Sequence, residues 1–172
     1  MNSSIQTKPV VAIIGRPNVG KSTLFNRITR TRNALVADEP GVTRDINIGI
    51  GQLGDADYLV IDTGGIDSGA SSEVNEMVSA RALEAVVDAD ALILVVDGAD
   101  GITSEDQFIA NTARKAGKPV HLAVNKADRI SEQDSVAFFE LGMGAPYLVS
   151  ALRGQGVESL IADISQDWPP RG

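Results

Sequence analysis

The sequence contains no cysteine and only one histidine, His121. The absence of cysteine excludes a disulfide-stapled extracellular domain, and a lone histidine leaves almost no ligands for a zinc site. His121 stands inside the apolar run 120–124. We therefore interpret it as a structural residue rather than as a metal ligand.

A long apolar run and a secretory signal are also missing. No stretch approaches the roughly 18 apolar residues that suggest a membrane-spanning helix. Residues 1–8 are polar and lack the apolar segment of a signal peptide, so we expect them to form a flexible N-terminus. The sequence predicts a soluble, cytoplasmic protein with no membrane partner.

Basic residues are too few to balance the acidic ones, at 15 against 23, and the formal net charge is −8. A domain of this charge repels polyanions and does not supply the counterion release that drives most nucleic-acid binding. We expect no direct nucleic-acid binding from this domain alone. The length of 172 residues and the hydrophobic share of 43% fit one globular domain.

Five short apolar runs have the length of strands. They are rich in Val, Ile and Leu, which is typical of strands buried on both faces of a mainly parallel sheet. A sixth segment differs, because Ile46, Ile48 and Ile50 alternate with other residues before a Gly-Asp turn, and it predicts a half-buried edge strand hairpinned to its neighbour. The five apolar runs are 9–14, 58–61, 91–96, 120–124 and 147–149.

Helical segments are predicted between the strands. Thr103 and Asp106, and likewise Ser131 and Asp134, have the spacing of a hydroxyl and an acid that cap a helix N-terminus reciprocally. Apolar residues at 157, 160, 161 and 164 predict a last helix that packs on the sheet. The alternation predicts a three-layer α/β fold, with a mixed, mainly parallel six-stranded sheet and helices on both faces.

Directly after the first predicted strand, residues 15–22 read Gly-Arg-Pro-Asn-Val-Gly-Lys-Ser. This is the phosphate-binding P-loop pattern in its strand–loop–helix context, in which glycines let the backbone N–H groups curl around phosphate oxygens. Lys21 is predicted to bridge the β- and γ-phosphates and the Ser22 hydroxyl to bind Mg²⁺. A simple glycine turn would explain neither side chain. The predicted nucleotide contacts here are Gly15, Asn18, Val19, Gly20, Lys21, Ser22 and Thr23.

The base is indicated by Asn125-Lys126-Ala127-Asp128, at the end of a later predicted strand. The Asp128 carboxylate can accept hydrogen bonds from N1–H and from the 2-amino group of guanine, whereas adenine offers neither donor. Lys126 has a stem long enough to lie along a base face, and Asn125 can tie its loop to the P-loop. Behind a P-loop, this pattern predicts GTP and GDP as ligands.

Taken in order, five motifs resemble those of translation-factor-class GTPases, and the match spans nearly the whole chain. Residues 15–27, 40–45 and 61–66 more narrowly resemble the first G domain of the Der (EngA) family, bacterial GTPases with two G domains in tandem. The resemblance implies a G domain at 9–167. Residues 168–172, Trp-Pro-Pro-Arg-Gly, cannot continue a helix and predict the start of an interdomain linker, in a fragment of a longer protein. The motifs are 15–22, Thr43, 62–65, 125–128 and 150–152.

The same resemblance implies roles for further residues. Thr43 would bind Mg²⁺ and the γ-phosphate, Asp62 would hold a magnesium-bound water, and the Gly65 N–H would contact the γ-phosphate. Ser150, Ala151 and Leu152 would support guanine, with the Ala151 N–H reaching its 6-oxygen. The segments 31–45 and 62–79 would be ordered by GTP and released after hydrolysis.

Catalysis departs from the familiar pattern, because Ile66 stands where many GTPases have a water-orienting glutamine. We therefore expect slow intrinsic turnover or a substitute cation. The resemblance suggests K⁺ held by Asn18, although asparagine in this loop is equally explained as a turn residue. Arginines 16, 30, 32 and 44 are alternatives in cis. The predicted catalytic residues are Asn18, Lys21, Thr43 and Gly65.

Two classes of function remain open at this level. The first is a GTP-hydrolysing switch in the assembly of the large (50S) ribosomal subunit, working as a monomeric domain with a second G domain and an RNA-facing domain in cis. The second is a regulatory nucleotide-binding module with little hydrolysis. A related GTPase of tRNA modification or small-subunit maturation is a further alternative.

Overall fold

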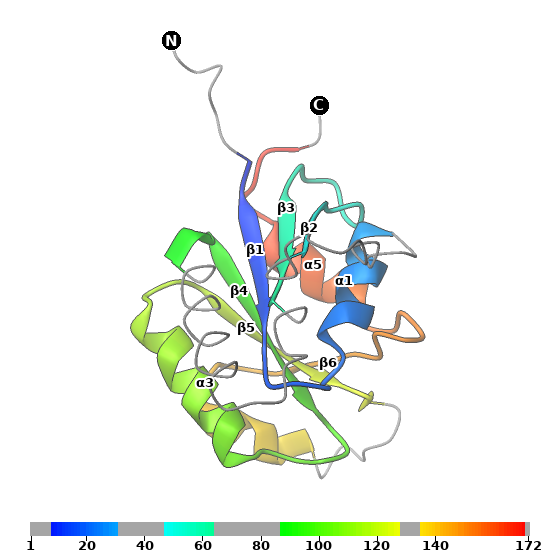
Figure 1. The fold of residues 1–172 in the computed structure, drawn as a ribbon. Helices are drawn as coiled ribbons and strands as arrows, with labels where there is room; N and C mark the ends of the chain where they lie inside the picture. The colour runs from blue at the N-terminus through cyan, green and yellow to red at the C-terminus, as the bar shows by residue number, and fades with distance from the viewer. Residues whose placement is uncertain (1–7, 31–46, 64–86, 128–134, 171–172) are drawn as a thin grey trace, which may run out of the picture.

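The computed structural model describes residues 8–30, 47–63, 87–127 and 135–170. Within them lies a six-stranded sheet in the order β2-β3-β1-β4-β5-β6, parallel except for the β2–β3 pair (Figure 1). The predicted fold class is confirmed. The strands are β1 (Val10–Ile14), β2 (Asn47–Ile50), β3 (Leu59–Asp62), β4 (Ala91–Asp97), β5 (Val120–Asn125) and β6 (Tyr147–Leu148).

Helices cover both faces of the sheet (Figure 1). Val11 and Ile13 of β1 pack into a core with α1 (Lys21–Thr29) and α5 (Val157–Ile164). Ala12 and Ile14 point to the opposite face, where α3 (Ser104–Lys115) and the 3-10 helix η5 (Val136–Leu141) lie. Because successive strand residues alternate between faces, one apolar strand supplies both cores.

The edge strand β2 pairs antiparallel with β3, as its alternation predicts. Its isoleucines, however, do not supply the buried face: Ile48 is 64% exposed and Ile50 is 50% exposed. Gly49 faces α1 instead, where an added Cβ would lie 2.8 Å from Thr29 Cγ2. The alternation located the strand correctly but did not reveal which face α1 would cover.

The capping box of α3 forms as predicted. Asp106 N–H donates to Thr103 Oγ1 at 3.1 Å, and Thr103 N–H donates to Asp106 Oδ2 at 2.9 Å. Ser131 and Asp134 lie outside the described residues, and the helix at 136–141 is a 3-10 helix. The predicted last helix, α5, packs on the sheet and ends at Ile164, before the prolines.

Replacing Thr103 by alanine should lower the free energy of unfolding by about 1 kcal/mol, because the first turn of α3 loses its side-chain acceptor. Urea unfolding followed by circular dichroism measures the change. Thr112→Ala is the matched control, since Thr112 Oγ1 donates to the Phe108 carbonyl in an exposed hydrogen bond within the same helix and does not cap its first turn. Equal losses in both variants would contradict a specific capping effect.

The last described residues lie against the domain. Trp168 packs on Tyr58 with ring centroids 5.7 Å apart, and Pro170 forms an isolated antiparallel bridge with Ala56. The linker start at 168 stays a prediction, and residues 1–7 lie outside the described part. No helix within the described ranges has the length and apolar character needed to cross a membrane.

Candidate nucleotide-binding site

The loop at 15–20 connects the C-terminal end of β1 to the first turn of α1, at the sheet edge where open α/β folds bind ligands. Gly20 has φ of 104°, and an added Cβ would lie 2.2 Å from Asn125 Nδ2. At Gly15 an added Cβ would lie 2.6 Å from the Val95 carbonyl oxygen. The loop is therefore packed too closely against β4 and β5 for a side chain at either glycine.

Lys21 is buried at the start of α1, with 3% of its surface exposed. Its Nζ donates to the carbonyl oxygens of Gly15 at 2.5 Å and Arg16 at 2.7 Å. The ammonium thus lies within the curl of the loop, next to the N-terminal end of a helix. Both features favour binding of a phosphate group.

Ser22 and Asp62 meet at the ends of α1 and β3. Ser22 Oγ donates to Asp62 Oδ2 at 3.2 Å, and Asp62 is completely buried. Nearby, Thr63 Oγ1 donates to the Ile13 carbonyl at 2.9 Å and fastens the end of β3 to β1. A hydroxyl and a carboxylate are oxygen donors of the kind that Mg²⁺ takes together with substrate phosphates, so these residues fit the predicted ion. Within the described residues no group of three or more His, Asp or Glu forms an all-protein metal site.

Asn125, at the end of β5, joins the P-loop to a second loop. Its Nδ2 donates to the Val19 carbonyl at 2.9 Å, and its Oδ1 accepts from Ala151 N–H at 2.9 Å. The side chain is buried, and both of its polar atoms are used. The tie to the P-loop expected from the sequence is present, and the second tie to Ala151 was not predicted.

Lys126 and Ala127 continue from β5 toward the predicted guanine carboxylate. Ala127 N–H donates to the Val149 carbonyl at 3.0 Å. Lys126 has φ of 66°, and its Nζ lies 2.8 Å from Asp97 Oδ2. These contacts hold the segment after β5 against Val149, which follows β6, and against Asp97 at the end of β4.

Asp97 is a site residue that the sequence analysis missed. Burial alone would raise the pKa of its carboxyl, but hydrogen bonds from Lys126 and from the Ala99 and Asp100 backbone N–H groups outweigh burial and lower the pKa. Asp97 therefore stays ionised and fixes the Lys126 side chain. Its position as the last residue of a buried strand, at the C-terminal edge of the sheet, was the signal available in the sequence.

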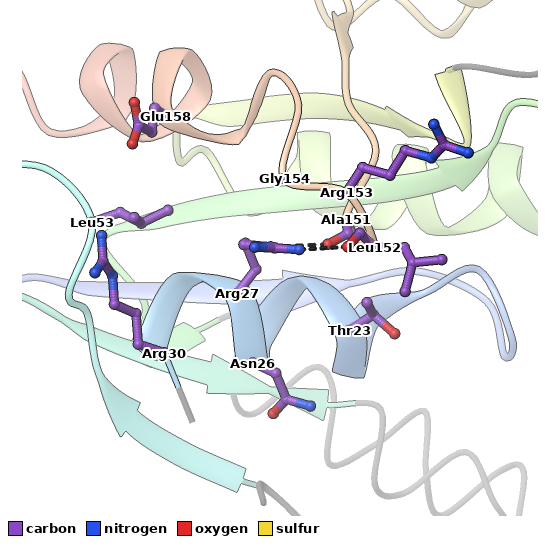
Figure 2. Close-up of a pocket in the computed structure, with 10 residues that line it drawn as sticks. All are labelled: Thr23, Asn26, Arg27, Arg30, Leu53, Ala151, Leu152, Arg153, Gly154 and Glu158. Carbon is purple, nitrogen blue, oxygen red and sulfur yellow. Dashed lines mark hydrogen bonds between the residues drawn. The ribbon is translucent and has the colours of Figure 1, made fainter. Parts of the chain in front are cut away.

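The loop at 150–154 closes the site. Ser150 is buried and its Oγ accepts from Arg153 N–H at 3.2 Å, whereas Leu152 is 77% exposed. A groove of about 700 Å³ lies between this loop and α1, and its lining includes Thr23, Ala151 and Leu152 (Figure 2). Since the Ala151 N–H already donates to Asn125, its predicted contact with guanine stays a prediction.

Thr43, Gly65, Ile66 and Asp128 lie outside the described residues. The structure brings together the remaining predicted residues at one edge of the sheet: the P-loop, Ser22 with Asp62, and Asn125 with Ala151.

Two of the arginines considered as catalytic cations are described. Arg16 is paired with Asp100 at 3.0 Å and with Asp106 at 3.2 Å. Burial would lower the pKa of Arg16, but these carboxylates outweigh it and raise the pKa. Arg30 follows the C-terminal end of α1, about 13 Å along the helix from the P-loop. Neither is placed as a free cation beside Lys21.

Asn18 is exposed, with φ of 67°. Asparagine is among the few residues that adopt this left-handed conformation readily, so the turn explanation accounts for its presence in the loop. Its exposed side chain is compatible with the ion-binding explanation as well.

A family model described as a 50S ribosome-binding GTPase matches residues 10–126. The chain belongs to this GTPase family. It is 50% identical to GTPase Der of Aromatoleum aromaticum over 165 residues, 95% of this chain and 37% of that protein. It is 48% identical to GTPase Der of Neisseria meningitidis serogroup C over 163 residues, 94% of this chain and 34% of that protein.

The predicted resemblance to Der is thus confirmed, and the chain spans little more than a third of the length of these curated relatives. Among solved structures, this chain is similar to Era in complex with MgGDPNP and nucleotides 1506–1542 of 16S ribosomal RNA. The TM-score is 0.77 at 27% identity, covering 97% of this chain and 59% of the Era chain.

Proposed function

We propose that this GTPase is a switch domain that binds GTP with Mg²⁺, hydrolyses it to GDP and phosphate, and acts in assembly of the 50S ribosomal subunit. One observation carries the nucleotide part: the buried Asn125 amide joins the phosphate-binding loop at Val19 to the loop at Ala151. A single side chain thereby couples the two regions that a guanine nucleotide would span.

The phosphate end of the site is assigned to α1 and β3. Lys21 would exchange its bonds with the Gly15 and Arg16 carbonyls for oxygens of the β- and γ-phosphates. Ser22 would ligate Mg²⁺, Asp62 would hold one of its waters, and the ion would neutralise charge on the transferring phosphoryl group. Thr43 and Gly65 would contact the γ-phosphate, so their segments would report its presence.

The base end is assigned to the loops after β5 and β6. Asp128 would accept from N1–H and the 2-amino group of guanine, with Lys126 along the ring face. Ala151 N–H would reach the 6-oxygen, and Ser150 and Leu152 would support this loop. Lys126 is already fixed by Asp97, so its stem is positioned before the base arrives.

Turnover is the property that separates a switch enzyme from a binding module. Ile66 cannot orient water, and Arg16 is engaged by two carboxylates. We infer that K⁺ near Asn18 supplies the missing positive charge and that intrinsic hydrolysis is slow without it.

The test is phosphate release from GTP in potassium and in sodium at equal ionic strength. We expect roughly tenfold faster release in potassium and no comparable hydrolysis of ATP. Because Asn18 has φ of 67°, Asn18→Gly removes the amide without straining the loop, and it should abolish the potassium effect. Asn111→Ala on the exposed face of α3 is the control.

Each alternative outcome has a distinct meaning. Equal rates in both salts would remove the K⁺ hypothesis. Tight GTP binding without turnover in either salt would favour the regulatory module. ATP binding as strong as GTP binding would reject the guanine assignment altogether.

The 50S assignment rests on the family description and on 50% identity to Der. The Era structure includes 16S ribosomal RNA, which makes small-subunit maturation the alternative, but the identity there is 27%. With its acidic charge, the domain would handle nucleotide as a cytoplasmic monomeric unit. A second G domain and an RNA-facing domain in the whole protein would make the ribosomal contacts.

A further inference from the structure

The Arg16 side chain connects the phosphate-binding loop to α3. Its Nη2 donates to Asp100 Oδ2 at 3.0 Å, and its Nε donates to Asp106 Oδ1 at 3.2 Å. Asp100 lies in the segment between β4 and α3, and Asp106 lies in the first turn of α3. The planar guanidinium therefore binds two carboxylates of one neighbouring segment at once, through a fork that a lysine lacks.

Asp106 is shared between this ion pair and the cap of α3. Its side chain is completely buried, and its Oδ2 accepts from Thr103 N–H while its Oδ1 accepts from Arg16. The Arg16 side chain is 14% exposed, whereas that of Asp100 is 56% exposed. Breaking a buried ion pair leaves an uncompensated charge, whereas exposed pairs contribute little. The pair with Asp106 is therefore the main attachment of Arg16.

The backbone at the start of the loop also holds Lys21. The carbonyl oxygens of Gly15 and Arg16 accept from Lys21 Nζ. In the proposed function Lys21 turns from these carbonyls to the phosphates, so the start of the loop loses both contacts when nucleotide binds. The ion pairs of Arg16 do not use Lys21 and would persist. The other end of the loop is held independently of Lys21, by the bond from the Asn125 amide to the Val19 carbonyl.

We propose that Arg16 is a positioning residue for phosphate binding, which holds the start of the phosphate-binding loop against Asp106 while Lys21 turns to the nucleotide. The inference deepens the proposed function and rests on it, because it concerns the phosphate end of that site. Arg16 acts through the loop backbone and not by contact with phosphate, since its guanidinium is engaged by two carboxylates.

The experiment measures binding of GDP and GMP to Arg16→Ala by titration calorimetry, at a temperature below the unfolding midpoint of the variant. GMP lacks the β-phosphate, which is the group assigned to Lys21 and to the curl of the loop. We expect Kd to rise about tenfold for GDP and less than about twofold for GMP. Equal weakening of both nucleotides would make Arg16 a general structural residue and overturn the proposal, as would an unchanged Kd for GDP.

A double-mutant cycle tests whether Arg16 acts through Asp106. Asp106→Ala removes the buried partner and should also weaken GDP about tenfold, and the double variant should lose little more, because the contact is already broken. Losses that simply add would show that the two residues act independently and would overturn the proposal. The double variant removes both charges of the pair, so it also allows the measurement if the unpaired carboxylate prevents Arg16→Ala from folding.

Thr103→Ala is the matched control. It weakens the first turn of α3 but keeps the backbone N–H of residue 103 and both carboxylate oxygens of Asp106, so it should leave both nucleotide affinities unchanged. A loss of GDP affinity as large as in Arg16→Ala would assign the effect to the stability of α3 and overturn the proposal.

The wild-type protein separates this inference from the proposed function. Failure of the wild type to bind GDP would reject the proposed function, and this inference with it. Tight binding of GDP by the wild type that persists in Arg16→Ala would overturn the role of Arg16 alone.

Discussion

Replacing Asp128 by asparagine should lower the affinity for GDP on the order of a thousandfold and produce a protein that prefers xanthosine diphosphate. The carboxylate would accept two hydrogen bonds from guanine, whereas an amide presents one acceptor and one donor. The donor faces the guanine 2-amino group and leaves it unpaired, but it matches the 2-oxygen of xanthine. Competition binding with both diphosphates measures the exchange.

The described neighbours of Asp128 support an effect confined to the base. The loop before it is fixed by the Ala127–Val149 hydrogen bond and by the Lys126–Asp97 ion pair, neither of which uses Asp128. The P-loop contacts of Lys21 are likewise independent. Xanthosine diphosphate should therefore bind the variant with nearly the affinity that GDP has for the wild type.

Asp55→Asn is the matched control, because Asp55 is exposed in the turn between β2 and β3. It should leave both affinities unchanged. Loss of affinity for both diphosphates in Asp128→Asn would indicate a disrupted loop, and unchanged affinity for GDP would contradict the role of Asp128 in base recognition.

Replacing Asn125 by alanine should have the largest effect on stability and also weaken GDP binding. Two buried backbone groups, the Val19 carbonyl and the Ala151 N–H, would each lose a partner, at a combined cost of about 3 kcal/mol of unfolding free energy. The two loops would no longer be tied together. Because the groups that bind the nucleotide would then be misplaced, the affinity for GDP should fall about a hundredfold.

Chemical unfolding and GDP titration, at a temperature well below the unfolding midpoint, measure the two effects. Asn125→Asp retains the acceptor for Ala151 N–H but places a buried carboxylate oxygen against the Val19 carbonyl, so at neutral pH it should lose at least as much stability as Asn125→Ala. Asn111→Ala, which removes an exposed acceptor for Arg114, should change neither quantity. Full GDP affinity in Asn125→Ala would contradict the coupling of the two loops.

Much of the fold could be predicted from local patterns in the sequence. Continuous apolar runs located the buried parallel strands, because strands covered on both faces have no polar side to display. The Thr103 and Asp106 spacing located the start of α3, since reciprocal capping depends on a separation of three residues. The same reasoning located β2 but not its buried face, because the face that α1 covers depends on Gly49 and on packing against a helix from another part of the chain.

The candidate site, like the fold, could be predicted only in part from the sequence. Motif spacing identified the P-loop, the Ser22 hydroxyl and the Asn125 loop, because each is a short segment whose chemistry depends on near neighbours. The contacts of Asp97 and Arg27 could not be predicted, because neither residue belongs to a local sequence motif. Their partners are Lys126, 29 positions away, and the carbonyls of Ala151 and Leu152, 124 and 125 positions away.

The sequence by itself determined the sheet-and-helix alternation and the phosphate-binding loop, and it suggested the proposed preference for a guanine nucleotide, since these depend on residue types at short, regular spacing. Only the tertiary structure showed that the Asn125 side chain bonds to two loops and that Arg16 forms ion pairs with Asp100 and Asp106. It also showed that Arg27 donates to the Ala151 carbonyl in the loop at 150–154. Long-range contacts of this kind exist only after the parallel strands bring their C-terminal ends together at one edge.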